Sequence, residues 1–178
     1  MFAQDPREVA PTDNNYAAST SRYGFNSSHL GRFYPSPVQG RVINFTESPS
    51  DVSSEGMTFW CKKYMPINLF KYFPEYPKIE NPVSGAGYQI VSDNYLDTIF
   101  ICKRDFVPLY NEIKWNGTNF VYGNNIVDLR DKRYFKDVSW TLSYSPMDKS
   151  FVSWHDWHPD LVIQTDEHFV TVKYEDVS

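Results

Sequence analysis

Large apolar and small polar residues alternate along much of the second half of the chain. The clearest alternating runs are residues 140–144 (WTLSY) and 151–154 (FVSW), which flank a turn cluster that contains Pro146. A period of two is typical of β-strands that bury one face, and proline presets the φ angle of the first central residue in a type I turn. The pattern therefore predicts a β-hairpin over residues 140–154.

Further strands are predicted at residues 40–46, 88–91 and 168–174, and an apolar run predicts another at residues 97–103. No stretch shows the apolar period that a helix needs in order to bury one face. Short strands separated by turn residues are typical of antiparallel all-β folds. We therefore expect a mainly β fold of short antiparallel strands, arranged as a sandwich, a barrel or part of a propeller.

An Asn-Gly pair lies between two further runs, residues 113–115 and 118–122. Asn and Gly both accept the positive φ angles that the two central residues of a type I′ turn require. We expect Asn116 and Gly117 to form such a two-residue turn and so to connect the strands of a second hairpin.

The first third of the chain has a different pattern. Residues 1–56 are rich in Ser, Asn and Pro and show no sustained period, so we expect a long extended N-terminal arm. Aromatic side chains are spaced along this arm, among them Phe33 and Tyr34, and they favour docking on another surface. Residues 81–178 form the predicted antiparallel β domain.

Residues 57–80, between the arm and the β domain, are apolar and aromatic. Three prolines in this segment exclude a long helix, because proline lacks an amide hydrogen and clashes with the preceding turn. At most one short helical turn fits, around residues 68–72. We interpret the segment as a cover for the β domain, with four aromatic side chains packed inward: Phe59, Trp60, Phe70 and Phe73.

Composition narrows the classes of partner. Aromatic residues make up 17% of the chain, which favours sheets, and the formal net charge of −5 argues against a general nucleic-acid-binding protein. No run approaches the ~20 apolar residues of a membrane-spanning helix. Cys61 and Cys102 do not have the spacing of a zinc site or the number of a disulfide scaffold. They fit buried thiols, with a single bridge as the alternative.

The densest group of potentially reactive side chains is His155, Asp156, His158 and Asp160. Imidazole and carboxylate groups are ligands of zinc and other transition metals, so these four residues are weak metal candidates. On an extended strand, however, His155 and Trp157 share one face while His158 lies on the other. We therefore expect structural histidines, with no metal, no cofactor and no catalytic residue.

The same region carries a resemblance to a known family. Residues 137–146 (DVSWTLSYSP) and 149–160 (KSFVSWHDWHPD) resemble a signature of large virion proteins of crAss-like tailed bacteriophages. Residues 97–105 and 34–40 are also similar to that family. The resemblance assigns structural positions only, namely Trp140, Tyr144, Trp154, His155, Trp157 and Pro159. Members of the family are usually much longer, and Trp is common at the position that Phe151 occupies here.

The resemblance implies a non-catalytic structural component of a phage virion, located in the tail or its muzzle and multimeric with other virion proteins. We expect the arm to dock on neighbouring subunits, and the last strand to leave an edge that pairs with a partner. One alternative is a carbohydrate-binding or receptor-binding module of the tail tip, which would bind a glycan through exposed Trp and Tyr rings. Another is a small hydrolase that uses His155, Asp156 and His158.

Overall fold

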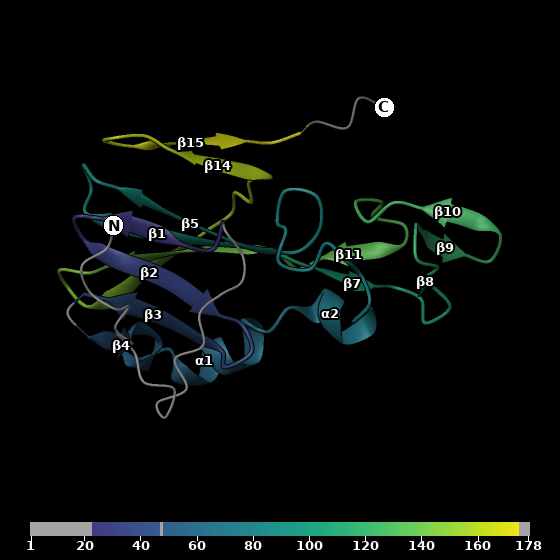
Figure 1. Ribbon diagram of the computed structural model, residues 1–178, viewed down its shortest axis with the longest axis horizontal. Helices are drawn as coiled ribbons and strands as arrows, with labels where there is room; N and C mark the ends of the chain where they lie inside the picture. The colour runs from purple at the N-terminus through teal and green to yellow at the C-terminus, as the bar shows by residue number, and fades with distance from the viewer. Residues whose placement is uncertain (1–22, 47, 175–178) are drawn as a thin grey trace, which may run out of the picture.

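The computed structural model describes residues 23–46 and 48–174 and shows a mainly β protein with several antiparallel sheets (Figure 1). One four-stranded sheet has the order β13-β12-β6-β5, and we call it the central sheet. Its strands are β5 (Gly87–Asp93), β6 (Thr98–Arg104), β12 (Trp140–Ser145) and β13 (Ser150–His155). The predicted mainly β, antiparallel character is confirmed.

The alternating runs that were predicted as strands form most of this sheet. Residues 88–91 lie in β5, and the run predicted over residues 97–103 lies in β6 from Thr98 onward. Residues 140–154 form the β12–β13 hairpin. The hairpin register pairs Thr141 with His155 and Ser145 with Ser150, and a bulge interrupts the pairing between Ser143 and Tyr144. The predicted hairpin is therefore confirmed.

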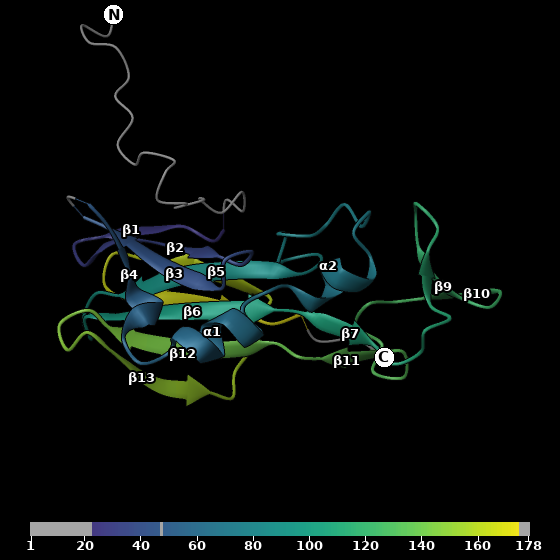
Figure 2. The same cartoon turned by 90° about the horizontal axis from the view of Figure 1, so that it is seen from below.

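Side chains of the central sheet alternate between two covered faces. Ile99 and Ile101 of β6 belong to the main hydrophobic cluster. In Figure 2, helix α1 (Thr58–Tyr64) lies in front of this sheet. Phe100 points to the opposite face, where its ring centroid lies 5.0 Å from that of Phe169. Because both faces are covered, every residue of β5 is buried.

A second four-stranded sheet precedes the helices, and Figure 1 shows its strands side by side. Its strands are β1 (Asn26–Ser28), β2 (Gly31–Ser36), β3 (Arg41–Phe45) and β4 (Pro49–Asp51), followed by the 3-10 helix η2 (Val52–Ser54). Phe33 and Val42 of this sheet are buried in the main hydrophobic cluster. This differs from the expected arm over residues 1–56, because Phe33, which was expected to dock on another surface, is buried in the chain's own core. Residues 1–22 lie outside the described part.

Two short helices occupy the aromatic segment. Helix α2 (Asn68–Tyr72) coincides with the predicted helical turn, whereas α1 was not expected. The seven residues of α1 end before Pro66, so the proline limits the helix without preventing it. The inward packing predicted for Phe59 and Phe70 is wrong, since these side chains are 82% and 53% exposed, while Phe73 is buried and Trp60 is partly buried.

Smaller sheets extend from one end of the central sheet (Figure 2). They contain β7 (Phe106–Pro108), β8 (Lys114–Trp115), β9 (Phe120–Tyr122), β10 (Asn125–Val127) and β11 (Phe135–Asp137). The predicted hairpin is present as β8 and β9, but its two-residue type I′ turn is wrong. Trp115 pairs with Phe120, so four residues form the loop, and Gly117 alone among them has positive φ. Asn116 instead accepts hydrogen bonds at its side-chain oxygen from the amides of Thr118 and Asn119.

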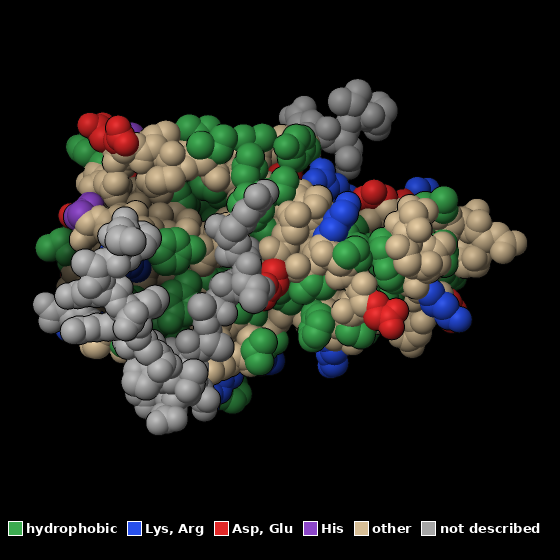
Figure 3. Space-filling view, in the orientation of Figure 1, with side chains coloured by type: hydrophobic (Ala, Val, Ile, Leu, Met, Phe, Trp, Pro, Cys, Tyr) green, Lys and Arg blue, Asp and Glu red, His purple; other side chains and the backbone are tan. Residues whose placement is uncertain are grey.

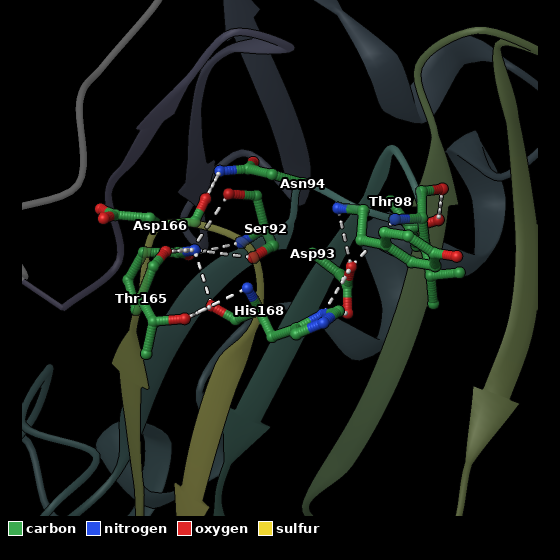
Figure 4. Close-up of polar contacts among 10 residues, drawn as sticks. Ser92, Asp93, Asn94, Thr98, Thr165, Asp166 and His168 are labelled. Carbon is green, nitrogen blue, oxygen red and sulfur yellow. Dashed lines mark hydrogen bonds and ion pairs between the residues drawn. The ribbon is translucent and has the colours of Figure 1, made fainter.

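The C-terminal hairpin consists of β14 (Leu161–Gln164) and β15 (Phe169–Val172), and both strands pack against β5. The sequence predicted β15 but not β14. Polar contacts join the turn of this hairpin to the β5–β6 turn (Figure 4). The side-chain amide of Asn94 donates to the carbonyl of Asp166 at 2.7 Å, and Nδ1 of His168 lies 3.2 Å from Asp93.

The main hydrophobic cluster contains residues from both four-stranded sheets, the helical segment and the small sheets. It joins Phe33 of the second sheet, Met65 between the two helices, Ile99 of the central sheet and Phe120 of the small sheets. The three predicted segments therefore share one core. Within residues 23–46 and 48–174, no helix has the length and apolar character to cross a membrane.

Candidate functional site

The group of potentially reactive residues predicted from the sequence begins where β13 ends. Nε2 of His155 lies 3.0 Å from the hydroxyl oxygen of Ser143 on β12. The imidazole packs on the rings of Phe100 and Trp157, at centroid distances of 5.2 and 5.5 Å. His155 and Trp157 both pack on Phe100, so they share a face as the period of two predicted. Trp157 also contacts Phe169 of the C-terminal hairpin, at a centroid distance of 5.9 Å.

The other three members of the group are not gathered around His155. Asp156 is exposed. His158 lines a cavity together with Arg104 and Arg130, and His155 is not among the residues that line it. Asp160 is buried, forms an ion pair with Arg104, and accepts the amide hydrogen of Tyr174 at 2.7 Å. In the part of the chain that the structure describes, no group of three His, Cys, Asp or Glu residues is placed to hold a metal ion.

The sequence pattern did not predict the buried ion pair between Lys103 and Asp105. Nζ of Lys103 lies 2.7 Å from Asp105, and both side chains are almost fully buried, with 1% and 0% exposed. The ammonium also donates to the carbonyls of Tyr64 and Pro66, each at 2.8 Å. Burial lowers the pKa of Lys103, and the neighbouring carboxylate opposes this shift. Because Tyr64 ends α1 and Pro66 lies between the helices, these hydrogen bonds connect the helical segment to β6.

Four aromatic side chains form a cluster at the outer side of the central sheet: Trp60, Tyr64, Trp140 and Trp154. The ring of Trp60 lies 4.4 Å from that of Trp154 and 5.0 Å from that of Trp140. It stacks on Tyr64 at 5.1 Å. Trp154 is 49% exposed and Tyr64 is 41% exposed, so this aromatic cluster is both a packing element and a surface.

The remaining predicted structural residues are internal. Tyr144 is buried, with its ring 6.1 Å from Phe33, and its hydroxyl donates to Glu55 at 2.7 Å. Burial, together with Glu55, raises the pKa of Tyr144. Pro159 is buried, and Tyr34 is partly buried on β2.

The two outer strands of the central sheet differ in how they are covered. On β5, the outward amide of Ile90 donates to the carbonyl of Tyr23 at 3.1 Å, and that of Ser92 donates to the Gln164 side chain at 2.8 Å. On β13, among the described residues, β12 is the single strand partner. Its side chains are mostly exposed, with Val152 at 60%. Within residues 23–46 and 48–174, one edge of the sheet is therefore covered and the other, that of β13, is bare.

Both cysteines are free and buried. Burial raises the pKa of the Cys61 thiol from 9.0 to about 12, and that of the Cys102 thiol likewise from 9.0 to about 12. Cys61 lies in the main cluster, while Cys102 pairs in register with Thr141 on β12. Thiols with such raised pKa values are poor nucleophiles, because the thiolate is the reactive form.

Similarity to known proteins adds no family to this description. Comparison with protein-family models, with curated proteins and with solved structures gives no match.

Proposed function

We propose that this protein is a non-catalytic structural component of a phage virion, in the tail or muzzle, and that it assembles by pairing β13 with an extended strand of a neighbouring subunit. The bare edge of β13 supports the assembly step. The resemblance of residues 137–160 to tail-associated virion proteins supports the location, and those residues include β12 and β13. We assign docking to the β13 edge because Phe33 and Val42, which lie within the expected arm, are buried in the chain's own core.

The chemistry of β13 fits a strand partner. Exposed edge strands usually carry proline or lysine, which discourage pairing with another chain. β13 contains neither, and it exposes Val152 and Trp154 instead. An added strand would form main-chain hydrogen bonds along the edge while apolar side chains of the partner cover these two residues.

The direct test is the protein content of particles. Tailed particles purified from the phage that encodes this chain should contain its peptides in mass spectrometry. In a phage carrying Val152→Lys, we expect the chain's abundance per particle to fall by about tenfold, because an unpaired charge at an interface costs more than ~1.4 kcal/mol.

The matched control is Ile126→Lys, which places a lysine on another exposed strand, β10, where the side chain is 71% exposed. This variant should enter particles like the original chain. Both lysine variants should unfold at the original temperature when isolated. Absence of the chain from purified particles would exclude a virion component, and normal incorporation of Val152→Lys would exclude docking through β13.

The half-exposed Trp154 ring also supports a second candidate, a carbohydrate-binding module of the tail tip. Sugars stack on exposed aromatic faces. The planes of Trp60 and Trp154, however, meet at 60°, so the two rings do not form a flat platform. Binding on a glycan array that disappears with Trp154→Ala would favour this module, while an array without binding leaves strand docking as the better account.

A further inference from the structure

A cavity of about 550 Å³ lies where the end of the central sheet, the segment before β11 and the C-terminal hairpin meet. Five Lys and Arg side chains line it, and four of them have no buried counterion of their own outside the groove: Arg104, Arg130, Lys132 and Lys173. We call this cavity the basic groove. Figure 3 shows Lys and Arg side chains beside hydrophobic ones between the C-terminal hairpin and β11.

The basic groove has an excess of positive charge. Its other charged lining residues are Asp137, Asp160 and Lys103, and Lys103 is already paired with the buried Asp105. Four cationic groups therefore face two carboxylates. In a chain with a formal net charge of −5, this local excess of two positive charges is unlike the protein as a whole.

Two of the cations are held in place by the fold. Arg104 forms an ion pair with Asp160 and donates to the carbonyl of Pro82 at 3.2 Å. Arg130 lies 3.6 Å from the same carboxylate and donates to the carbonyl of Val83 at 3.3 Å. Burial lowers the pKa of Arg104, Asp160 counters this shift, and the charge of Arg130 adds to it. The two guanidinium groups thus share one carboxylate, and a further anion would relieve their repulsion.

Other groups in the basic groove have unused hydrogen-bonding capacity. Lys132 and Lys173 are exposed and, within the described part of the chain, form no ion pair. Nδ1 of His158 is buried and has no hydrogen-bond partner among the described residues. The ring of Tyr174, on which the Arg130 guanidinium lies at 5.5 Å, adds an apolar side to the groove.

We propose that the basic groove binds a small organic anion through phosphate or carboxylate groups, with a preferred charge of about −2. The volume lies within the range of roughly 300–1,000 Å³ that is usual for small-molecule sites. Arg104 and Arg130, which the fold holds in place, would orient the anion by hydrogen bonds. Lys132 and Lys173 would add positive charge, and the imidazole of His158 would add a further polar contact. This inference is independent of docking through β13, because the basic groove and that edge share no residue.

The test is calorimetric titration of the full-length chain at constant ionic strength. The probes are glucose 6-phosphate and citrate. Glucose, which lacks the phosphate group, is the uncharged control for glucose 6-phosphate. We expect saturable binding of at least one anion and none of glucose. Binding of glucose 6-phosphate alone identifies a phosphate site, binding of citrate alone identifies a carboxylate site, and binding of both identifies a general anion site.

The variant for this test is Lys132→Ala/Lys173→Ala, which removes two exposed side chains and should leave folding intact. The matched control is Lys62→Ala/Lys114→Ala, which removes two equally charged exposed lysines outside the groove. We expect the groove variant to weaken anion binding by about tenfold and the control to bind within about twofold of the original chain. Absence of saturable anion binding, or equal weakening in both variants, would overturn the proposal.

Discussion

At the residue scale, Asp105 shows how one buried carboxylate can organise several elements. Its side chain accepts hydrogen bonds from the amide and the side chain of Asn68, at 2.7 and 2.8 Å, and from the amide of Leu69, at 3.0 Å. It is also the counterion of Lys103. A residue that follows β6 thus caps the start of α2, where backbone amides lack helical partners.

Replacing Asp105 with alanine should lower the free energy of unfolding by about 3–5 kcal/mol, because the buried Lys103 ammonium would lose its counterion and the α2 amides would lose their acceptor. Urea unfolding monitored by tryptophan fluorescence measures the loss. The control is Asp156→Ala, which changes an exposed aspartate and should cost no more than about 0.5 kcal/mol. Equal stability of the two variants would contradict the capping role of Asp105.

At the scale of elements, the β2–β3 turn meets α1 with no room for a side chain. Gly40 has a φ of +63°, and a Cβ atom at this position would lie 2.5 Å from the Cα atom of Lys62. Gly123, in the turn between β9 and β10, has nearly the same φ, +59°, but no atom within 4 Å of a Cβ. The two glycines therefore separate the cost of backbone conformation from the cost of close approach.

Gly123→Ala should cost about 1–2 kcal/mol, the usual penalty for a residue with a Cβ atom in the left-handed region. Gly40→Ala should cost about 1–3 kcal/mol more, because the β2–β3 turn and α1 must also move apart. Thermal unfolding of the two variants under the same conditions provides the comparison. If Gly40→Ala were as stable as Gly123→Ala, the turn and the helix could not be in the contact described.

At the scale of the whole molecule, one hydrophobic cluster unites segments that the sequence pattern separates. Phe33 and Val42 are fully or almost fully buried, and they belong to the same cluster as Cys61 and Ile99. Tyr144 of β12 contacts Phe33 of the second sheet and Glu55, which follows η2. The β domain therefore depends on the second sheet for one side of its core.

A fragment of residues 57–178 should consequently fail to fold cooperatively, because it lacks the side chains that cover Ile99 and Tyr144. Near-ultraviolet circular dichroism should show no fixed aromatic signal, and urea unfolding should lose its sigmoidal form. A fragment of residues 23–178, which retains the second sheet, serves as the control and should unfold in a single transition. Cooperative unfolding of the shorter fragment would show that the β domain is independent.

Local patterns were sufficient to predict several elements. Most strands were predicted because apolar residues alternate with polar ones along them, and β6 was predicted from a continuous apolar run. The position of α2 was predicted because prolines lie on both sides of it. β14 and α1 were missed for a different reason. Leu161 to Gln164 is too short for a period to be visible, and α1 exposes Phe59 while burying Cys61, so its pattern does not resemble an amphipathic helix.

The sequence alone determined which side chains share a face of the central sheet, because a period of two is a property of the extended backbone itself. It separated His155 from His158 and placed Trp157 beside His155. Only the tertiary structure decided which groups meet across long separations, such as Lys103 with Tyr64, or Asp160 with Arg104. Those contacts depend on how sheets and hairpins pack, so the basic groove and the bare edge of β13 became visible only in the folded chain.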